Sequence, residues 1–217
     1  HSQRPMDVAK ALEPIMEHTR EAFASKNHAR ETALPLCREA IRFSANAIRA
    51  VHRREFETAA DLVEKARSCL ATAKQSLAGH SDIYHAGFVH DSQKEYAEAS
   101  ITLAIIAGRP FPTPQQLDVE LPAFLNGMGE AVGELRRHLL DVLRTGDVEQ
   151  CEIWLDAMDD MYSVLVTIDY PDAMTGGLRR TTDSVRGILE KTRGDLTLSV
   201  QQRRLEQRLS DFDRKLT

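Results

Sequence analysis

The sequence is poor in residues that break regular structure, with 11 glycines and 8 prolines among 217 residues. Aromatic side chains make up only 6% of the chain. A β architecture needs many turns and favours aromatic and β-branched residues in its strands, so this composition argues against one. Alanine, leucine, glutamate and arginine are plentiful, and all four are strong helix formers. The composition therefore predicts an all-α protein.

The chain also has no apolar run of 18 residues, and its three cysteines, Cys37, Cys69 and Cys151, form no CxxC pair. The first absence argues against a membrane-spanning helix. The second argues against the common zinc and disulfide frameworks and leaves three thiols that suit a reducing cytoplasm. A net charge of −5 argues against a strongly basic arm on duplex DNA, although a local basic surface could still bind nucleic acid. We therefore expect a cytoplasmic protein with no membrane contact.

Several catalytic signatures are missing as well: the GxSxG elbow, the GxxxxGK[ST] phosphate loop and the HExxH zinc motif. The glycines of GMGEAVG (127–133) follow no predicted strand, and close helix packing explains them better than a dinucleotide loop does. His80, His85 and His90 are five residues apart, and each step advances about 140° around a helix. They cannot share one helix face, so we expect surface or boundary positions rather than a metal site.

Apolar periodicity predicts helices along most of the chain, and we expect residues 1–217 to form one domain. The Pro-rich segment GRPFPTP (108–114) is the clearest break. In the last helix, Leu205, Leu209 and Phe212 lie on one side, so this stripe should be covered by the same chain or by a neighbouring subunit. The predicted helices are 5–24, 30–54, 55–78, 83–108, a long helix from 121 to the RTGD turn at 144–147, 148–169, 178–193 and 195–215.

Two pairs of carboxylates have helical spacing. Glu95 and Glu98 are three residues apart and Glu130 and Glu134 are four apart, so the members of each pair project from one face. The face of Glu95 and Glu98 continues into an apolar region, where acids usually need a partner. For Glu130 and Glu134 an ordinary solvated column is the alternative. If all four converge, they will repel one another unless a cation or a proton removes the charge.

Oxygen ligands of this kind favour Mg²⁺ or Mn²⁺, and such a metal suits the hydrolysis of phosphodiesters. A ferritin-like di-iron site is a competing use of carboxylates in a helical protein. That site needs Glu-x-x-His motifs, whereas ELRRH (134–138) has the wrong spacing. Arg30, Arg38 and Arg42 belong to an arginine-rich helix, which is either a solvated face paired with nearby acids or a surface that follows phosphates.

Two segments, KEYAEASITLAIIAG (94–108) and LPAFLNGMGEAVGELRRHLLDVLRTGD (121–147), resemble the translin family, and more closely its translin-associated factor X (Trax) branch. Glu95 and Glu98 match the two glutamates of that branch's Q-E-Y-V-E-A motif, and Glu134 matches the glutamate of its Gly-Glu-Leu. Glu130 stands where the branch commonly has aspartate, which keeps the charge and adds one methylene. The resemblance extends more weakly over most of the chain.

The resemblance implies an all-α, translin-like bundle or superhelix of about seven helices and a hollow homo-octamer. It implies binding of single-stranded RNA or DNA and, in the Trax branch, a metal-dependent endoribonuclease. We therefore expect cleavage of single-stranded RNA, with Mg²⁺ or Mn²⁺ held by the four glutamates and with Arg30, Arg38 and Arg42 on the RNA phosphates. The main alternative is a non-catalytic scaffold of the translin type that binds single strands, and a purely structural bundle is the third.

Overall fold

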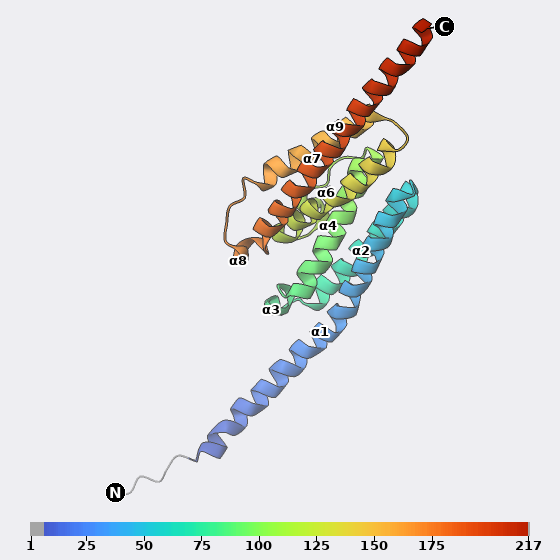
Figure 1. Ribbon diagram of the computed structural model, residues 1–217. Coiled ribbons are helices and arrows are strands. Elements are labelled where there is room, and N and C mark those ends of the chain that lie inside the picture. Colours follow the sequence, from blue (N-terminus) through green and yellow to red (C-terminus); the bar gives the residue numbers. More distant parts are fainter. Residues whose placement is uncertain (1–6, 217) are drawn as a thin grey trace.

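The computed structural model describes residues 7–216, and within this range it contains helices and no strand (Figure 1). The predicted all-α fold is confirmed. No helix in the described range is long and apolar enough to cross a membrane. The helices are α1 Val8–His52, α2 Phe56–Ser76, α3 Ser81–Tyr84, α4 Gly87–Ala107, α5 Pro114–Leu117, α6 Leu121–Leu143, α7 Val148–Leu165, α8 Asp172–Thr175 and α9 Leu178–Leu216.

Two predicted breaks between helices are wrong, because the chain stays helical at both places. Helix α1 joins the predicted helices 5–24 and 30–54, whose residues 5 and 6 lie outside the described range. The intervening residues 25–29 (SKNHA) include neither glycine nor proline, so nothing local stops the helix. Helix α9 likewise continues past Gly194. A glycine inside a helix costs only about 1 kcal/mol, and the buried Leu189 and Leu196 pack on either side of it.

The opposite error concerns the predicted helix 83–108, which is divided between α3 and α4. Ala86 is extended, with φ −73° and ψ 156°, and α4 begins at the following glycine. The one-turn helix α5 was not predicted. A capping box forms it, in which Thr113 accepts from the Gln116 amide while the Gln116 side chain accepts from the Thr113 amide.

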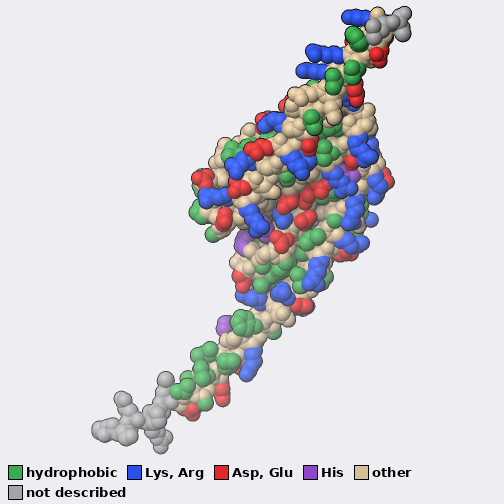
Figure 2. Space-filling view, viewed as in Figure 1, with side chains coloured by type: hydrophobic (Ala, Val, Ile, Leu, Met, Phe, Trp, Pro, Cys, Tyr) green, Lys and Arg blue, Asp and Glu red, His purple; other side chains and the backbone are tan. Residues whose placement is uncertain are grey.

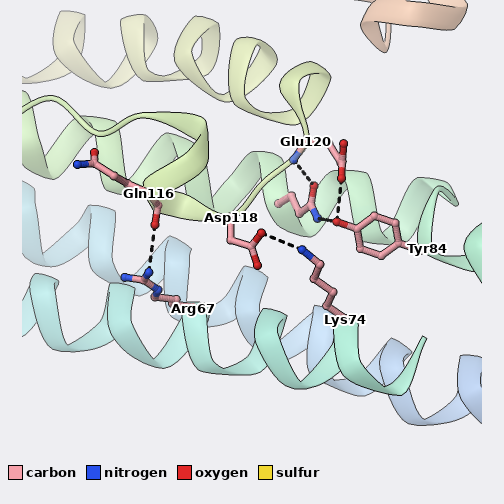
Figure 3. Close-up of polar contacts among 7 residues, drawn as sticks. Arg67, Lys74, Tyr84, Gln116, Asp118 and Glu120 are labelled. Atoms are coloured by element: carbon pink, nitrogen blue, oxygen red, sulfur yellow. Dashed lines mark hydrogen bonds and ion pairs between the residues drawn. The ribbon is translucent and has the colours of Figure 1, made fainter. Parts of the chain in front are cut away.

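The segment between α4 and α6 crosses back over α2, where side-chain contacts hold it (Figure 3). Arg67 of α2 donates to the carbonyl oxygen of Gln116 at 3.1 Å. Lys74, two turns further along α2, forms an ion pair with Asp118 at 2.8 Å. This return brings the start of α6 beside the start of α4, so the two helices run parallel (Figure 1).

Helices α4 and α6 approach closely at Gly127. A Cβ atom added there would lie 2.7 Å from the Lys94 carbonyl oxygen and 2.8 Å from the Ala97 Cβ, so no larger residue fits without moving the helices. A Cβ at Gly129 would likewise overlap Thr181 of α9, whereas one at Gly133 would make only an ordinary contact. Close helix packing thus explains Gly127 and Gly129, but Gly133 does not need it.

The first part of α1 and the last part of α9 project from opposite ends of the molecule (Figure 1). Both carry large apolar side chains that are more than 40% exposed, namely Val8, Leu12, Ile15, Met16 and Phe23 on α1, and Leu198, Leu205, Leu209 and Phe212 on α9. The stripe predicted for the last helix is therefore left uncovered by the described part of this chain.

Candidate active site

The four glutamates predicted from the sequence lie close together between α4 and α6. Glu95 and Glu98 project from α4, and Glu130 and Glu134 project from α6. The negative charges of the other three all act on Glu98, the most buried of the four at 8% exposure. Figure 2 shows Asp and Glu side chains gathered near the middle of the viewed face. We call these four residues the carboxylate cluster.

The surroundings of Glu98 favour its protonated form. Burial raises its pKa first, and the charges of Glu95, Glu130 and Glu134 raise it further, to about 9. Burial also raises the pKa of Glu95, although the neighbouring Lys94 opposes this effect. The hydrogen-bonding interaction between the two side chains lowers the pKa of Glu95 and raises that of Glu98, so the proton belongs to Glu98. Near neutral pH the cluster therefore contains a bound proton where a cation could stand.

A third helix reaches the cluster through His52, the last residue of α1. Its Nε2 lies 2.5 Å from the Oε2 of Glu134. An ionised carboxylate can only accept a hydrogen bond, so Nε2 is the donor. The His52 side chain is 5% exposed and that of Glu134 is 25% exposed, so the contact is shielded from water. Sequence reasoning missed His52, because no motif marks a residue 82 positions away from its partner.

The carboxylate cluster offers oxygen atoms as donors for a metal ion. Within residues 7–216, no three His, Cys, Asp or Glu side chains are arranged closely enough to hold a metal ion. The donors themselves suit Mg²⁺ or Mn²⁺, which prefer carboxylate oxygens. Burial and the charges of three neighbouring glutamates raise the pKa of Glu98, and a divalent cation beside it would stabilise its ionised form.

A polar groove of about 660 Å³ adjoins the cluster, with Glu130 forming part of its wall. Lys94 and Arg180 also line it, together with Ser184. Neither cation forms a salt bridge with a described residue, whereas Arg179, next in the chain, pairs with Asp169 at 2.8 Å. Asp91 and Asp172 line the same groove, so it presents cations and carboxylates side by side.

The other predicted site residues are less well gathered. Arg30 and Arg42 pair with acids of their own helix, Glu31 and Glu39. Arg42 also lies toward α2, since burial raises the pKa of Cys69 there and the charge of Arg42 opposes that rise. Arg38 is exposed on α1. Of the two interpretations given for this arginine-rich helix, the solvated face paired with acids therefore describes part of it.

The three histidines of this region occupy surface or boundary positions, as predicted. His80 precedes α3, His85 follows it, and His90 belongs to α4, where it lines the polar groove.

Fold and site together define a class, an all-α protein with a carboxylate cluster between two parallel helices. No family model matches the chain. Uncharacterized protein MJ0175 of Methanocaldococcus jannaschii is 30% identical over 190 residues, which cover 86% of this chain and 83% of that protein. The structure of AfC3PO in complex with duplex RNA is 32% identical, with a TM-score of 0.81, over 87% of this chain and 97% of that one.

The crystal structure of AfC3PO alone gives the same identity and a TM-score of 0.80. The crystal structure of apo-NeC3PO, at 19% identity and a TM-score of 0.75, shares the fold over 92% of this chain and all of that one. The chain therefore belongs to the translin family, to which these C3PO proteins belong.

The raised pKa of Glu98 predicts how stability depends on pH in the absence of metal. The folded protein keeps a proton on Glu98 up to about pH 9, whereas the unfolded chain loses it near the ordinary value of 4.5. Stability from this group is therefore fully present below pH 4.5 and is lost as the pH rises toward 9. In EDTA, we expect Glu98→Gln to flatten the fall of Tm between pH 5 and 9 and to raise Tm at pH 8.

The control is Glu190→Gln, which changes an exposed carboxylate on α9 and should leave the pH profile as in the wild type. Thermal melting followed by circular dichroism measures both. Parallel profiles for the wild type and Glu98→Gln would show that Glu98 is already ionised in the folded protein.

Proposed function

We propose that the protein is a metal-dependent endoribonuclease that cleaves single-stranded RNA, with Mg²⁺ or Mn²⁺ held by Glu95, Glu98, Glu130 and Glu134. The observation that carries the proposal is the carboxylate cluster, in which the charges of three glutamates act on a buried fourth. Its charge fits a divalent cation, and a bound cation would activate water and stabilise negative charge on the phosphate. The 32% identity to AfC3PO, which binds duplex RNA, supports RNA as the substrate class.

Within this proposal each residue of the cluster has a separate task. Glu98 is the buried member, so it must release its proton before its carboxylate can bind a cation. Glu95 lies next to Glu98 and is more open to solvent, so it would face the cation from the solvent side. His52 donates to Glu134 and so fixes the direction of that carboxylate, as a hydrogen-bonded support does at many metal sites.

The RNA strand would lie in the polar groove, with its phosphates on Lys94 and Arg180. Both cations are free of salt bridges to described residues, so no ion pair has to break when a phosphate binds. We propose Arg30, Arg38 and Arg42 as further phosphate contacts along α1, of which Arg38 is the least engaged with acids. Contacts of this kind follow the backbone and carry little base preference.

We also propose that one translin/Trax-like domain spanning 1–217 assembles in the cytoplasm into a hollow homo-octamer. The apolar side chains on the projecting parts of α1 and α9 support assembly, because exposed surface of this kind is usually covered by another subunit. An enclosed interior would admit short or flexible strands, including single-stranded DNA.

A second candidate function is a non-catalytic scaffold that binds single-stranded RNA or DNA. The raised pKa of Glu98 favours this function, because protonation of Glu98 reduces the repulsion among the four carboxyl groups without a metal ion. In that case the carboxylates would be structural.

A cleavage assay separates the two functions. With labelled single-stranded RNA and Mg²⁺, we expect Glu98→Gln to cut at least about a hundredfold more slowly than the wild type. Its affinity for RNA, measured in EDTA, should change little, because Glu98 is protonated in the metal-free protein and glutamine keeps both its shape and its neutrality. Glu190→Gln should cut like the wild type. Cleavage that survives in EDTA or in Glu98→Gln would disprove the site assignment, and no cleavage by the wild type would favour the scaffold.

Binding in the polar groove can be tested through its salt dependence. We expect Arg180→Ala to weaken RNA binding in EDTA and to reduce the slope of log K against log salt by about 1, since one phosphate contact is lost. Arg179→Ala is the matched control, because that side chain is tied to Asp169 outside the groove. Equal slopes for both variants would place the strand elsewhere.

Assembly can be tested by a mass determination in solution. We expect about 195 kDa for the wild type, which is eight chains of 24.4 kDa. The double variant Leu205→Glu, Leu209→Glu should lower this mass, because charges would replace the apolar stripe of α9. Gln207→Glu, on the opposite side of the same helix, should not. A monomeric wild type would contradict the proposed octamer.

A further inference from the structure

A second cavity lies on the other side of the carboxylate cluster from the polar groove. It has a volume of about 640 Å³ and is lined by the ends of α1, α4 and α6 and by α7. His52 forms part of its wall, and the same imidazole donates to Glu134. The cavity and the cluster are thus separated by one side chain. We call it the aromatic cavity.

The wall of this cavity combines aromatic and aliphatic side chains. His138 of α6 and Trp154 of α7 meet edge to face, with ring centroids 4.4 Å apart and planes at 71°. Ile105 of α4 and Val142 of α6 add apolar surface. Cavities lined in this way bind flat, mostly apolar parts of a ligand, and aromatic side chains pack favourably against other rings.

Polar groups accompany these rings. Both histidines are buried, and His52 Nδ1 and His138 Nε2 have no hydrogen-bond partner. Buried polar atoms without a partner are rare and call for an explanation. Arg54, Asp141 and Asp147 also line the cavity and are exposed to solvent, so its opening offers one cation and two carboxylates as acceptors.

We propose that the aromatic cavity binds the base of an RNA nucleotide next to the phosphate that is cut. The inference rests on the proposed function and adds a subsite to it. The base would pack against the accessible part of the wall of His138 and Trp154, which are 4% and 7% exposed, its polar edge would meet Asp141, and Arg54 would contact the adjoining phosphate. A planar ring with polar edges and a charged phosphate matches this combination of apolar wall and polar opening better than a purely apolar ligand does.

The position of the cavity supports this assignment over an unrelated small-molecule site. Lys94, Glu98 and Ile105 follow one another along α4, so the polar groove, the carboxylate cluster and the aromatic cavity occur in that order. A strand that follows the groove past the cluster therefore reaches the cavity within its next few nucleotides.

Trp154 is the only tryptophan in the chain, so its fluorescence reports on the cavity directly. The full-length protein is titrated in EDTA with adenosine 5′-monophosphate and, in parallel, with ribose 5-phosphate. After correction for absorption by the ligand, we expect a saturable change in tryptophan emission with the nucleotide. Ribose 5-phosphate, which lacks the base, should need at least about a tenfold higher concentration.

A variant that fills the cavity provides the second arm. Ala157 of α7 is half-buried and lines it, so Ala157→Leu should weaken nucleotide binding at least about tenfold while Tm changes little. Ala71→Leu is the matched control, since Ala71 is exposed on α2 at a different hollow. If Ala157→Leu does not fold, the comparison of the two ligands on the wild type still decides the question.

Failure of this inference differs from failure of the proposed function. Wild-type protein that cuts RNA in Mg²⁺ but gives no saturable fluorescence change, or the same change with ribose 5-phosphate, overturns the base site alone. Saturable binding of the nucleotide that Ala157→Leu abolishes supports the base site even if the wild type fails to cut RNA, in which case the nuclease function falls.

Discussion

The close contact of α4 and α6 at Gly127 determines the rest of the site. Gly127 leaves no room for a Cβ beside Ala97 and the Lys94 carbonyl, so the two helices run close together. Glu95 and Glu98 directly follow these residues on α4, and Glu130 and Glu134 follow Gly127 by one and two turns of α6, which brings the four acids together. Their mutual repulsion, added to burial, holds a proton on Glu98. A larger side chain at Gly127 would separate the helices and dilute the negative charge, so the glycine is as much a part of the site as the carboxylates are.

Burying Glu98 lowers the stability of the fold, and the packing around it offsets this loss. A buried carboxyl group is unfavourable in an apolar helix pair, yet Tyr96 and Ile101, beside it on α4, are almost fully buried in the main core. His52 adds a hydrogen bond from α1, which also fixes the end of that helix against α6. Groups with strongly shifted pKa values, held in place by an otherwise well-packed core, are typical of functional sites.

The sequence predicted some of these features and could not predict others. Helical spacing put Glu95 with Glu98 on one face, and the family resemblance linked them to Glu130 and Glu134, but periodicity cannot show that two helices run parallel and touch. His52 could not be found, because its role depends on a contact with Glu134 across 82 residues.

Among the helices, length decided what could be predicted. The long periodic helices were found, whereas the one-turn helices α3, α5 and α8 are too short to show a period. The capping residues Thr113 and Gln116 were a signal for α5 that a search for caps would have used. For the arginines of α1, spacing alone could not separate a phosphate-binding face from a face of ion pairs. Arg42 lies on the predicted face, but Glu39 is three residues away on the same helix and pairs with it.

The order of the three features along α4 bears on substrate choice. Lys94 and Ile105 are eleven residues apart, which is roughly 16 Å along a helix and on the order of three to five nucleotides of a strand. A base can enter the aromatic cavity only after it leaves its stack, at a cost of a few kcal/mol in a duplex and less in a single strand. Stacking on aromatic rings tolerates any base, so the proposed base site would select for strandedness and position rather than for sequence. Enclosure within an oligomer and the base site would therefore act in the same direction, in favour of short, unpaired RNA.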